Sequence, residues 1–154
     1  MNGLQITNCP ILYHVEIGNS SCKHFKSCEI SNVSSLQSIQ FGDDCFKDVC
    51  DFMLDGLYSL RTLKIGEKCF YIDNDQPLQG LCCITNCPNL CQLEIGNESF
   101  GHLEKLNLFN LNSLQSIRFG MSCFLYVDLS LKGNWIEMIS LHFNVDMNWN
   151  NFEI

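Results

Sequence analysis

Residues 82–91 read CCITNCPNLC and place four cysteines within ten positions. That density suggests a zinc site or a redox centre. A structural zinc site requires four ligands about 2.3 Å from one point, and neighbouring residues on a strand point to opposite faces. Whether these thiols can share one ion therefore depends on the elements that carry them.

The bulk composition is that of one globular domain. Of 154 residues, 46% are hydrophobic and 17% are charged, far from the composition of disordered chains. The net charge of −8 would repel phosphate backbones and anionic lipid, so we expect neither a nucleic-acid nor a membrane partner. No stretch approaches the roughly eighteen consecutive apolar residues of a membrane span.

The opening residues, MNGLQITNCP, lack the charged and apolar regions of an export signal. We therefore expect a cytoplasmic rather than a secreted location. The cysteines number eleven, which is odd. This count and that location favour reduced thiols packed as small hydrophobes over a complete disulfide framework.

The elements that position these cysteines follow a repeat. Short segments such as VEIG, IQFG and LKIG recur along the chain and end in Gly18, Gly42, Gly66, Gly96 and Gly120, with Asn144 in the next such position. Their spacing is 24 residues except for one interval of 30. Such a fixed period indicates a solenoid, here of six 24-residue turns with a six-residue insertion within residues 71–80.

Apolar residues recur two positions apart in each half of the unit, which is the period of a strand rather than a helix. In one half, the columns predicted to point inward are Ile17, Phe41, Ile65, Ile95, Phe119 and Phe143, and Val15, Ile39, Leu63, Leu93, Ile117 and Leu141. In the other half they are Leu4/Ile6, Cys28/Ile30, Phe52/Leu54, Cys82/Ile84, Leu106/Leu108 and, slipped by one residue, Leu129/Leu131. Each turn should thus hold two strands of about three residues.

The corners between these strands carry their own pattern. A phenylalanine stack is predicted four residues after the glycine, at Phe46, Phe70, Phe100 and Phe124, with Cys22 replacing phenylalanine in the first turn. Corners are predicted at the glycines and near Asn8, Asn32, Gly56, Asn86 and Asn110. We expect glycine and asparagine there because both tolerate positive φ.

Two segments, LRTLKIGEKCF (60–70) and LQSIRFGMSCF (114–124), resemble the leucine-rich repeat frame LxxLxLxxNxL at its aliphatic and closing apolar positions. The spacing of phenylalanine, glycine and aliphatic residues is most similar to the irregular BspA-like branch, over nearly the whole chain. The asparagine position holds Ser20, Asp44, Lys68, Glu98 and Ser122 instead, which argues against an asparagine ladder. The resemblance implies a solenoid that binds other macromolecules on its exposed strand face and has no catalytic residues.

The expected fold is therefore mainly β: a right-handed, leucine-rich-repeat-like β-solenoid of about six 24-residue turns, with two short parallel sheets and little helix. Residues 1–154 should form a single repeat domain. We expect it to be part of a longer array, because the first turn opens with core-type Leu4 and Ile6 and the final NNFEI resembles the start of another turn.

This register bears directly on the cysteine cluster. Cys82 and Cys87 should point inward, whereas Cys83 and Cys91 should point outward. Two thiols on each side cannot converge on one ion, so we expect no metal and no cofactor. A second column, Cys45, Cys69 and Cys123, is interpreted as buried thiols, since side-by-side parallel strands rarely orient Cβ atoms for a disulfide.

No catalytic grouping is predicted. The histidines fall in three columns, at His14, His24, His102 and His142. Asp73 and Asp75, in the insertion, are interpreted as a solvated loop rather than a calcium site, because the ligand pattern is incomplete. A solenoid hydrolase would need a groove holding two or more carboxylates on neighbouring turns, and the columns predict none.

The outward column between the inward positions offers a polar face. Lys64, Glu94 and Arg118 alternate in sign on successive turns, which favours cross-strand pairing worth a few tenths of a kcal/mol per pair. Aromatic and arginine side chains beside this column are candidate anchors. The expected partner-binding face consists of Tyr13, Glu16, Gln40, Arg61, Lys64, Glu94, Arg118, Ile139 and His142.

The function expected from these features is that of a non-enzymatic protein–protein interaction module. One alternative is a structural or self-assembling spacer segment of a larger repeat protein, associating end to end through exposed strand edges. A solenoid hydrolase acting on polysaccharide is a further alternative.

Overall fold

The computed structural model of the chain describes residues 2–71, 80–101, 103–124, 128–132 and 140–143, the last two ranges by backbone alone. Within these ranges the chain is all strand and turn, with no helix. One sheet, called sheet A, contains the strands β1 (Gly3–Thr7), β3 (Ser27–Ser31), β5 (Asp51–Asp55), β7 (Leu81–Thr85), β9 (Lys105–Phe109) and β11 (Asp128–Lys132). The other, sheet B, contains β2 (His14–Ile17), β4 (Ser38–Phe41), β6 (Thr62–Ile65), β8 (Gln92–Ile95), β10 (Ser116–Phe119) and β12 (Ser140–Phe143).

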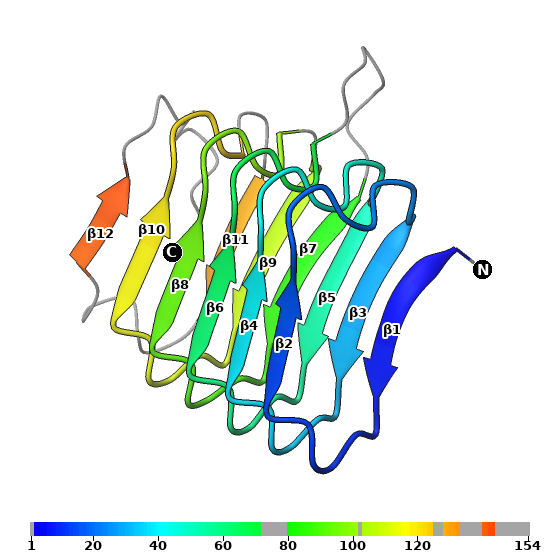
Figure 1. The fold of residues 1–154 in the computed structure, drawn as a ribbon. Coiled ribbons are helices and arrows are strands. Elements are labelled where there is room, and N and C mark those ends of the chain that lie inside the picture. The colour runs from blue at the N-terminus through cyan, green and yellow to red at the C-terminus, as the bar shows by residue number, and fades with distance from the viewer. Residues whose placement is uncertain (1, 72–79, 102, 125–127, 133–139, 144–154) are drawn as a thin grey trace.

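Successive strands alternate between the two sheets, and every pair within a sheet is parallel. The chain therefore coils as a β-solenoid, with about four turns and the two sheets facing each other (Figure 1). Because no described segment is a long apolar helix, none of the described chain offers a helical membrane span.

The register confirms the predicted repeat. Ile39 pairs with Leu63 at the 24-residue spacing, and Leu63 pairs with Leu93 at the 30-residue spacing created by the insertion. The predicted one-residue slip is also present, because Leu106 pairs with Leu129. The strands are longer than the three residues expected, at four in sheet B and five in sheet A. Backbone groups pair whatever side chain they carry, so pairing extends past the apolar residues.

The core lies between the sheets and follows the predicted columns. Ile30, Leu54, Ile84 and Leu108 are fully buried along sheet A, and Leu63 is 1% exposed in sheet B. In the first turn Leu4, Ile6, Leu12 and Ile17 are only half-buried, although Val15, the equivalent of Leu63, is buried. The difference arises because β1 and β2 have a neighbouring strand on one side only.

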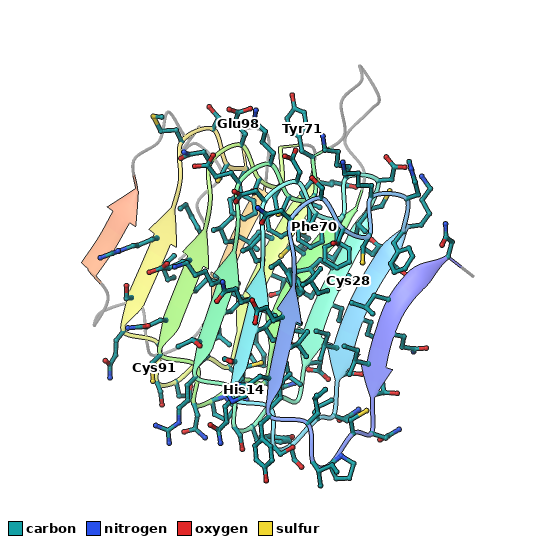
Figure 2. The ribbon with its side chains drawn as sticks, viewed as in Figure 1. His14, Cys28, Phe70, Tyr71, Cys91 and Glu98 are labelled. Atoms are coloured by element: carbon teal, nitrogen blue, oxygen red, sulfur yellow. The ribbon has the colours of Figure 1, made fainter. Side chains whose placement is uncertain are left out.

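The predicted phenylalanine stack is confirmed. Phe46, Phe70, Phe100 and Phe124 follow one another with ring centroids 5.2, 4.4 and 5.2 Å apart and nearly parallel planes. Figure 2 shows Phe70 and Cys28 between the two sheets. Close aromatic packing of this kind adds about 0.5 to 1.5 kcal/mol per pair beyond the burial of apolar area, so the stack ties successive turns together.

The backbone at the corners follows the prediction at one end of the strands but not at the other. Positive φ is found as expected at Asn8, Asn32, Gly56, Asn86 and Asn110. At the repeat glycines the expectation was wrong, because none of them has positive φ. The left-handed residues instead lie two and four positions later, at Ser20, Cys22, Asp44, Phe46, Lys68, Phe70, Glu98, Phe100, Ser122 and Phe124.

Bulky residues in this conformation cost about 1 to 2 kcal/mol each, and bonds between turns hold them there. The backbone N–H of Lys68 donates to the carbonyl of Asn97 at 2.8 Å, and that of Phe70 donates to the carbonyl of Cys45 at 3.1 Å.

The repeat glycines are required by spacing rather than by φ. A Cβ atom on Gly96 would lie 2.6 Å from the carbonyl carbon of Gly66, and one on Gly66 would lie 2.6 Å from that of Gly42. A Cβ on Gly18, in the first turn, would meet nothing within 4 Å. The glycine column thus allows successive corners to approach closely. Glycine is required there only where the corner of another turn is stacked against it.

Candidate interaction face and the cysteine columns

The four cysteines of residues 82–91 separate as predicted. Cys82 and Cys87 are 0% exposed in the core, whereas Cys83 and Cys91 are half-buried on the outer side. Cys91 and His14 lie at one end of the strands, opposite Tyr71 and Glu98 (Figure 2). Among the described side chains, no three His, Cys, Asp or Glu residues are grouped so that they could hold a metal ion.

The buried thiols are poor nucleophiles and poor ligands in their present surroundings. All eleven cysteines are unpaired. Burial raises the pKa of both Cys69 and Cys87 from 9.0 to about 12, and that of Cys123 to about 11. Reactive chemistry requires the thiolate, so these residues remain protonated core groups at neutral pH.

The second cysteine column has a role that the sequence did not predict. Each member stands three residues after a repeat glycine and donates a hydrogen bond to the glycine carbonyl of the preceding turn. Cys69 Sγ donates to Gly42 at 3.1 Å, and the ladder is completed by Cys45 to Gly18, Ser99 to Gly66 and Cys123 to Gly96. Buried backbone carbonyls need such partners, and serine replaces cysteine in one turn because a hydroxyl makes the same bond. The signal in the sequence was this alternation of cysteine and serine at one position.

A second ladder was also missed. The residue directly after each of the first four repeat glycines offers its side-chain oxygen to the next turn. Asp43 Oδ1 accepts from the backbone N–H of Glu67 at 2.8 Å, and Glu67 Oε1 accepts from Asn97 Nδ2 at 2.9 Å. The ladder continues at both ends with Asn19 to Asp43 and Asn97 to Met121. It lies one residue before the asparagine position of the leucine-rich repeat frame.

The outer surface of sheet B carries the predicted charge alternation. Lys64 Nζ lies 3.4 Å from Glu94 Oε2, and Arg118 Nη1 lies 3.7 Å from Glu94 Oε1, so one carboxylate pairs with two cations. The cationic side chains are 62% and 69% exposed, and that of Glu94 is 34% exposed. Exposed ion pairs of this type contribute only about 0.2 to 1 kcal/mol to the free energy of unfolding. Their main effect is therefore on the charge pattern of the surface.

Two shallow depressions lie beside this column. The first, of about 290 Å³, is lined on the outer surface of β4, β6 and β8 by Ser38, Gln40, Thr62, Lys64, Gln92 and Glu94. The second, of about 460 Å³, follows the repeat glycines and is called the glycine furrow; it is lined by Asp43, Gly66, Glu67, Gly96, Gly120 and neighbouring residues. Lys64 and Glu94 line both, so the depressions form one continuous surface.

The structure brings together part of the predicted face. Gln40, Lys64, Glu94 and Arg118 line the depressions. Tyr13, which is 52% exposed, and the exposed Glu16 and Arg61 do not line them. His142 pairs with Arg118 in the sheet, although only its backbone is described, and Ile139 lies outside the described residues.

The expectation that no groove holds carboxylates on neighbouring turns was wrong. Asp43, Glu67 and Glu94 come from three successive turns and all line the furrow. Glu94 pairs with two cations, and Asp43 and Glu67 are solvent-exposed. This open arrangement lacks the apolar enclosure that a general acid needs, and it is better suited to binding a cation or a polar chain.

One serine–histidine contact also occurs on this face. His14 Nδ1 lies 2.7 Å from Ser38 Oγ, across neighbouring strands. No described carboxylate hydrogen-bonds to the ring of His14, so the group that would orient a catalytic base is missing. The pair is therefore interpreted as a polar cross-strand contact.

Comparison of the chain with protein-family models, with curated proteins and with solved structures finds no match.

Proposed function

We propose that the chain is a non-enzymatic protein-interaction module, built as a right-handed, leucine-rich-repeat-like solenoid of six turns, and that the outer surface of sheet B is its contact face. The observation that carries this proposal is the exposed Lys64–Glu94–Arg118 column beside two joined depressions. Repeat proteins present such extended surfaces to partners.

Two properties of the contact face support the proposal: the strands that carry it are held on both sides, and its charges alternate in a fixed order. Each charged side chain projects from a strand that is paired on both sides, as Lys64 does from β6 between β4 and β8. A fixed alternation of charge favours partners of complementary pattern and disfavours others. Tyr13 and Arg61 at the margin are residues of the types that often anchor interfaces.

A capture experiment with matched variants tests the proposal. Lys64→Ala with Arg118→Ala removes two cations from the contact face, and Lys26→Ala with Lys105→Ala removes two from elsewhere on the molecule. The immobilised chains are exposed to extract of the source cells, and bound proteins are quantified by mass spectrometry. A partner should be lost on the first variant and retained on the second. Equal retention on both variants would contradict a contact face on sheet B.

The self-associating alternative is favoured by one observation. Leu4, Ile6, Leu12 and Phe25 form a half-buried apolar surface on the first turn, beside the single-sided strands β1 and β2. Sedimentation over a wide range of protein concentration separates the two functions. A constant monomer mass is expected for the interaction module, whereas mass that grows with concentration would favour end-to-end stacking.

A further inference from the structure

The glycine furrow is lined by one repeat glycine from each of three successive turns. Gly66, Gly96 and Gly120 contribute no side chains, and the turns approach so closely that none could be added at these positions without a clash. With successive turns about 4.8 Å apart, the furrow from Asp43 to Gly120 covers three spacings, or about 14 Å. That length accommodates four or five residues of an extended peptide, at about 3.3 Å per residue.

The charges along the furrow are unbalanced. Its lining contains two cations, Lys64 and Arg118, and three carboxylates, so the sum is 2 − 3 = −1. Both cations are paired with Glu94. Asp43 and Glu67 make no ion pair among the described side chains, and each uses only one carboxylate oxygen in the acceptor ladder. Both residues are solvent-exposed, and they lie on adjacent turns.

We infer that the glycine furrow binds an extended, basic segment of the partner protein, with Lys or Arg side chains meeting Asp43 and Glu67. This inference rests on the proposed function and adds the chemistry of the partner. The net charge of −8 would draw a basic segment to the molecule. Alternate residues of an extended peptide lie about 6.6 Å apart on one side, between the one-turn and two-turn spacings, and flexible lysine stems can close the difference.

The acceptor ladder permits variants that change charge without removing hydrogen bonds. Asp43→Asn keeps Oδ1 as an acceptor, as Asn19 and Asn97 do in other turns. Glu67→Gln keeps Oε1. The double variant D43N/E67Q therefore lowers the negative charge of the furrow by two while preserving the ladder.

A control variant, E29Q/D51N, makes the same charge change on the outer surface of sheet A. Two hydrogen bonds there go to oxygens that an amide retains: Glu29 Oε1 accepts from Ser31, and Asp51 Oδ1 accepts from the backbone of Leu81. Glu29 Oε2 also accepts from Gln5 Nε2 at 3.3 Å, and reversal of the exposed Gln5 amide lets a glutamine at position 29 donate in its place. Both double variants thus have the same net charge, and only one alters the furrow.

The probe is the pentapeptide Gly-Lys-Gly-Lys-Gly with an amidated C-terminus and an uncharged fluorophore on its N-terminus. Its binding is followed by fluorescence anisotropy at low ionic strength, with a Glu-containing peptide and a neutral oligosaccharide as comparisons. Two exposed ion pairs should be worth about a threefold to tenfold change in Kd. We expect D43N/E67Q to weaken binding by about that factor, and E29Q/D51N to change it by less than about twofold. Circular dichroism and urea denaturation verify that both variants fold.

Equal weakening by the two variants would overturn the inference, because it would show attraction by the overall charge. It would equally be overturned by the absence of wild-type binding to the lysine peptide, or by preferential binding of the acidic peptide or the oligosaccharide. The capture experiment distinguishes this failure from failure of the proposed function. If capture of a partner still depends on Lys64 and Arg118 but not on Asp43 and Glu67, the proposed contact face stands and the inferred peptide site in the furrow is refuted.

Discussion

Replacing Gly96 with alanine should destabilise the protein, whereas the same replacement at Gly18 should not. The new Cβ of Gly96→Ala would lie 2.6 Å from the carbonyl carbon of Gly66 and 2.7 Å from the nitrogen of Glu67. Ordinary contacts of this type are about 3.5 Å or longer, so the corners must separate by close to 1 Å. Gly18 stands in the same column, but a Cβ there meets nothing within 4 Å.

The expected loss of unfolding free energy follows from the hydrogen bonds that join the two turns at this corner. The N–H of Gly96 donates to Ile65 at 2.8 Å, and Ser99 Oγ donates to Gly66 at 2.9 Å. Such hydrogen bonds contribute about 0.5 to 1.5 kcal/mol each, and overpacking adds about 1 to 3 kcal/mol. Alanine also lowers the conformational entropy of the unfolded chain, which offsets this loss of stability by about 0.4 to 1 kcal/mol. The net loss for Gly96→Ala should be about 2 to 4 kcal/mol.

Urea denaturation followed by far-UV circular dichroism measures both variants. Gly18→Ala should change the free energy of unfolding by no more than about 1 kcal/mol, in the stabilising direction, because φ at that residue is not positive. Comparable losses at both positions would refute the reasoning, since glycine would then be required by local backbone conformation. A neutral Gly96→Ala would refute the close stacking of turns.

Three further predictions concern buried and half-buried side chains. Leu63→Ala should cost about 2 to 5 kcal/mol of unfolding free energy in urea denaturation, and a negligible cost would mean that the inward column is misassigned. Replacing Cys83 and Cys91 with serine should change stability by less than about 0.5 kcal/mol, and a larger loss in the same assay would show them buried or ligating. Burial raises the pKa of Cys69 and Cys87 from 9.0 to about 12, so the folded state holds protons that the unfolded chain releases above pH 9. Stability should therefore fall as pH rises from about 9 towards 12, less steeply in Cys69→Ser, and a fall of equal slope in that variant would contradict the assignment.

Features that depend on side-chain hydrophobicity could be predicted from the sequence. Leu63, Leu93 and Ile117 occupy one column because each must face the interior at the same point of its turn, and burial selects apolar residues at every repeat. The insertion was located for the same reason, since Leu63 pairs with Leu93 rather than with a residue 24 positions later. The pairing of Glu94 with two cations was also predictable, because opposite charges on neighbouring turns face each other.

Features that depend on the backbone could not be predicted in this way. Phe70 adopts positive φ although local preference opposes it. Hydrogen bonds to neighbouring turns outweigh this local cost. The thiol of Cys69 donates to a carbonyl 27 residues away, and a pattern of apolar residues treats that thiol only as a small hydrophobe. The glycine furrow was not predictable for a different reason: it follows from the missing side chains of Gly96 and its equivalents, whereas a sequence pattern indicates only the groups that are present.

The most direct test of the stacked coil is an isotope-edited NOESY spectrum of the backbone. Parallel stacking predicts Hα–HN contacts along one column from Ile39 to Leu63, then to Leu93 and then to Ile117, with the middle step spanning 30 residues. Close Hα–Hα contacts typical of antiparallel pairs, or contacts between residues at other separations, would contradict the coil on which the interaction face depends.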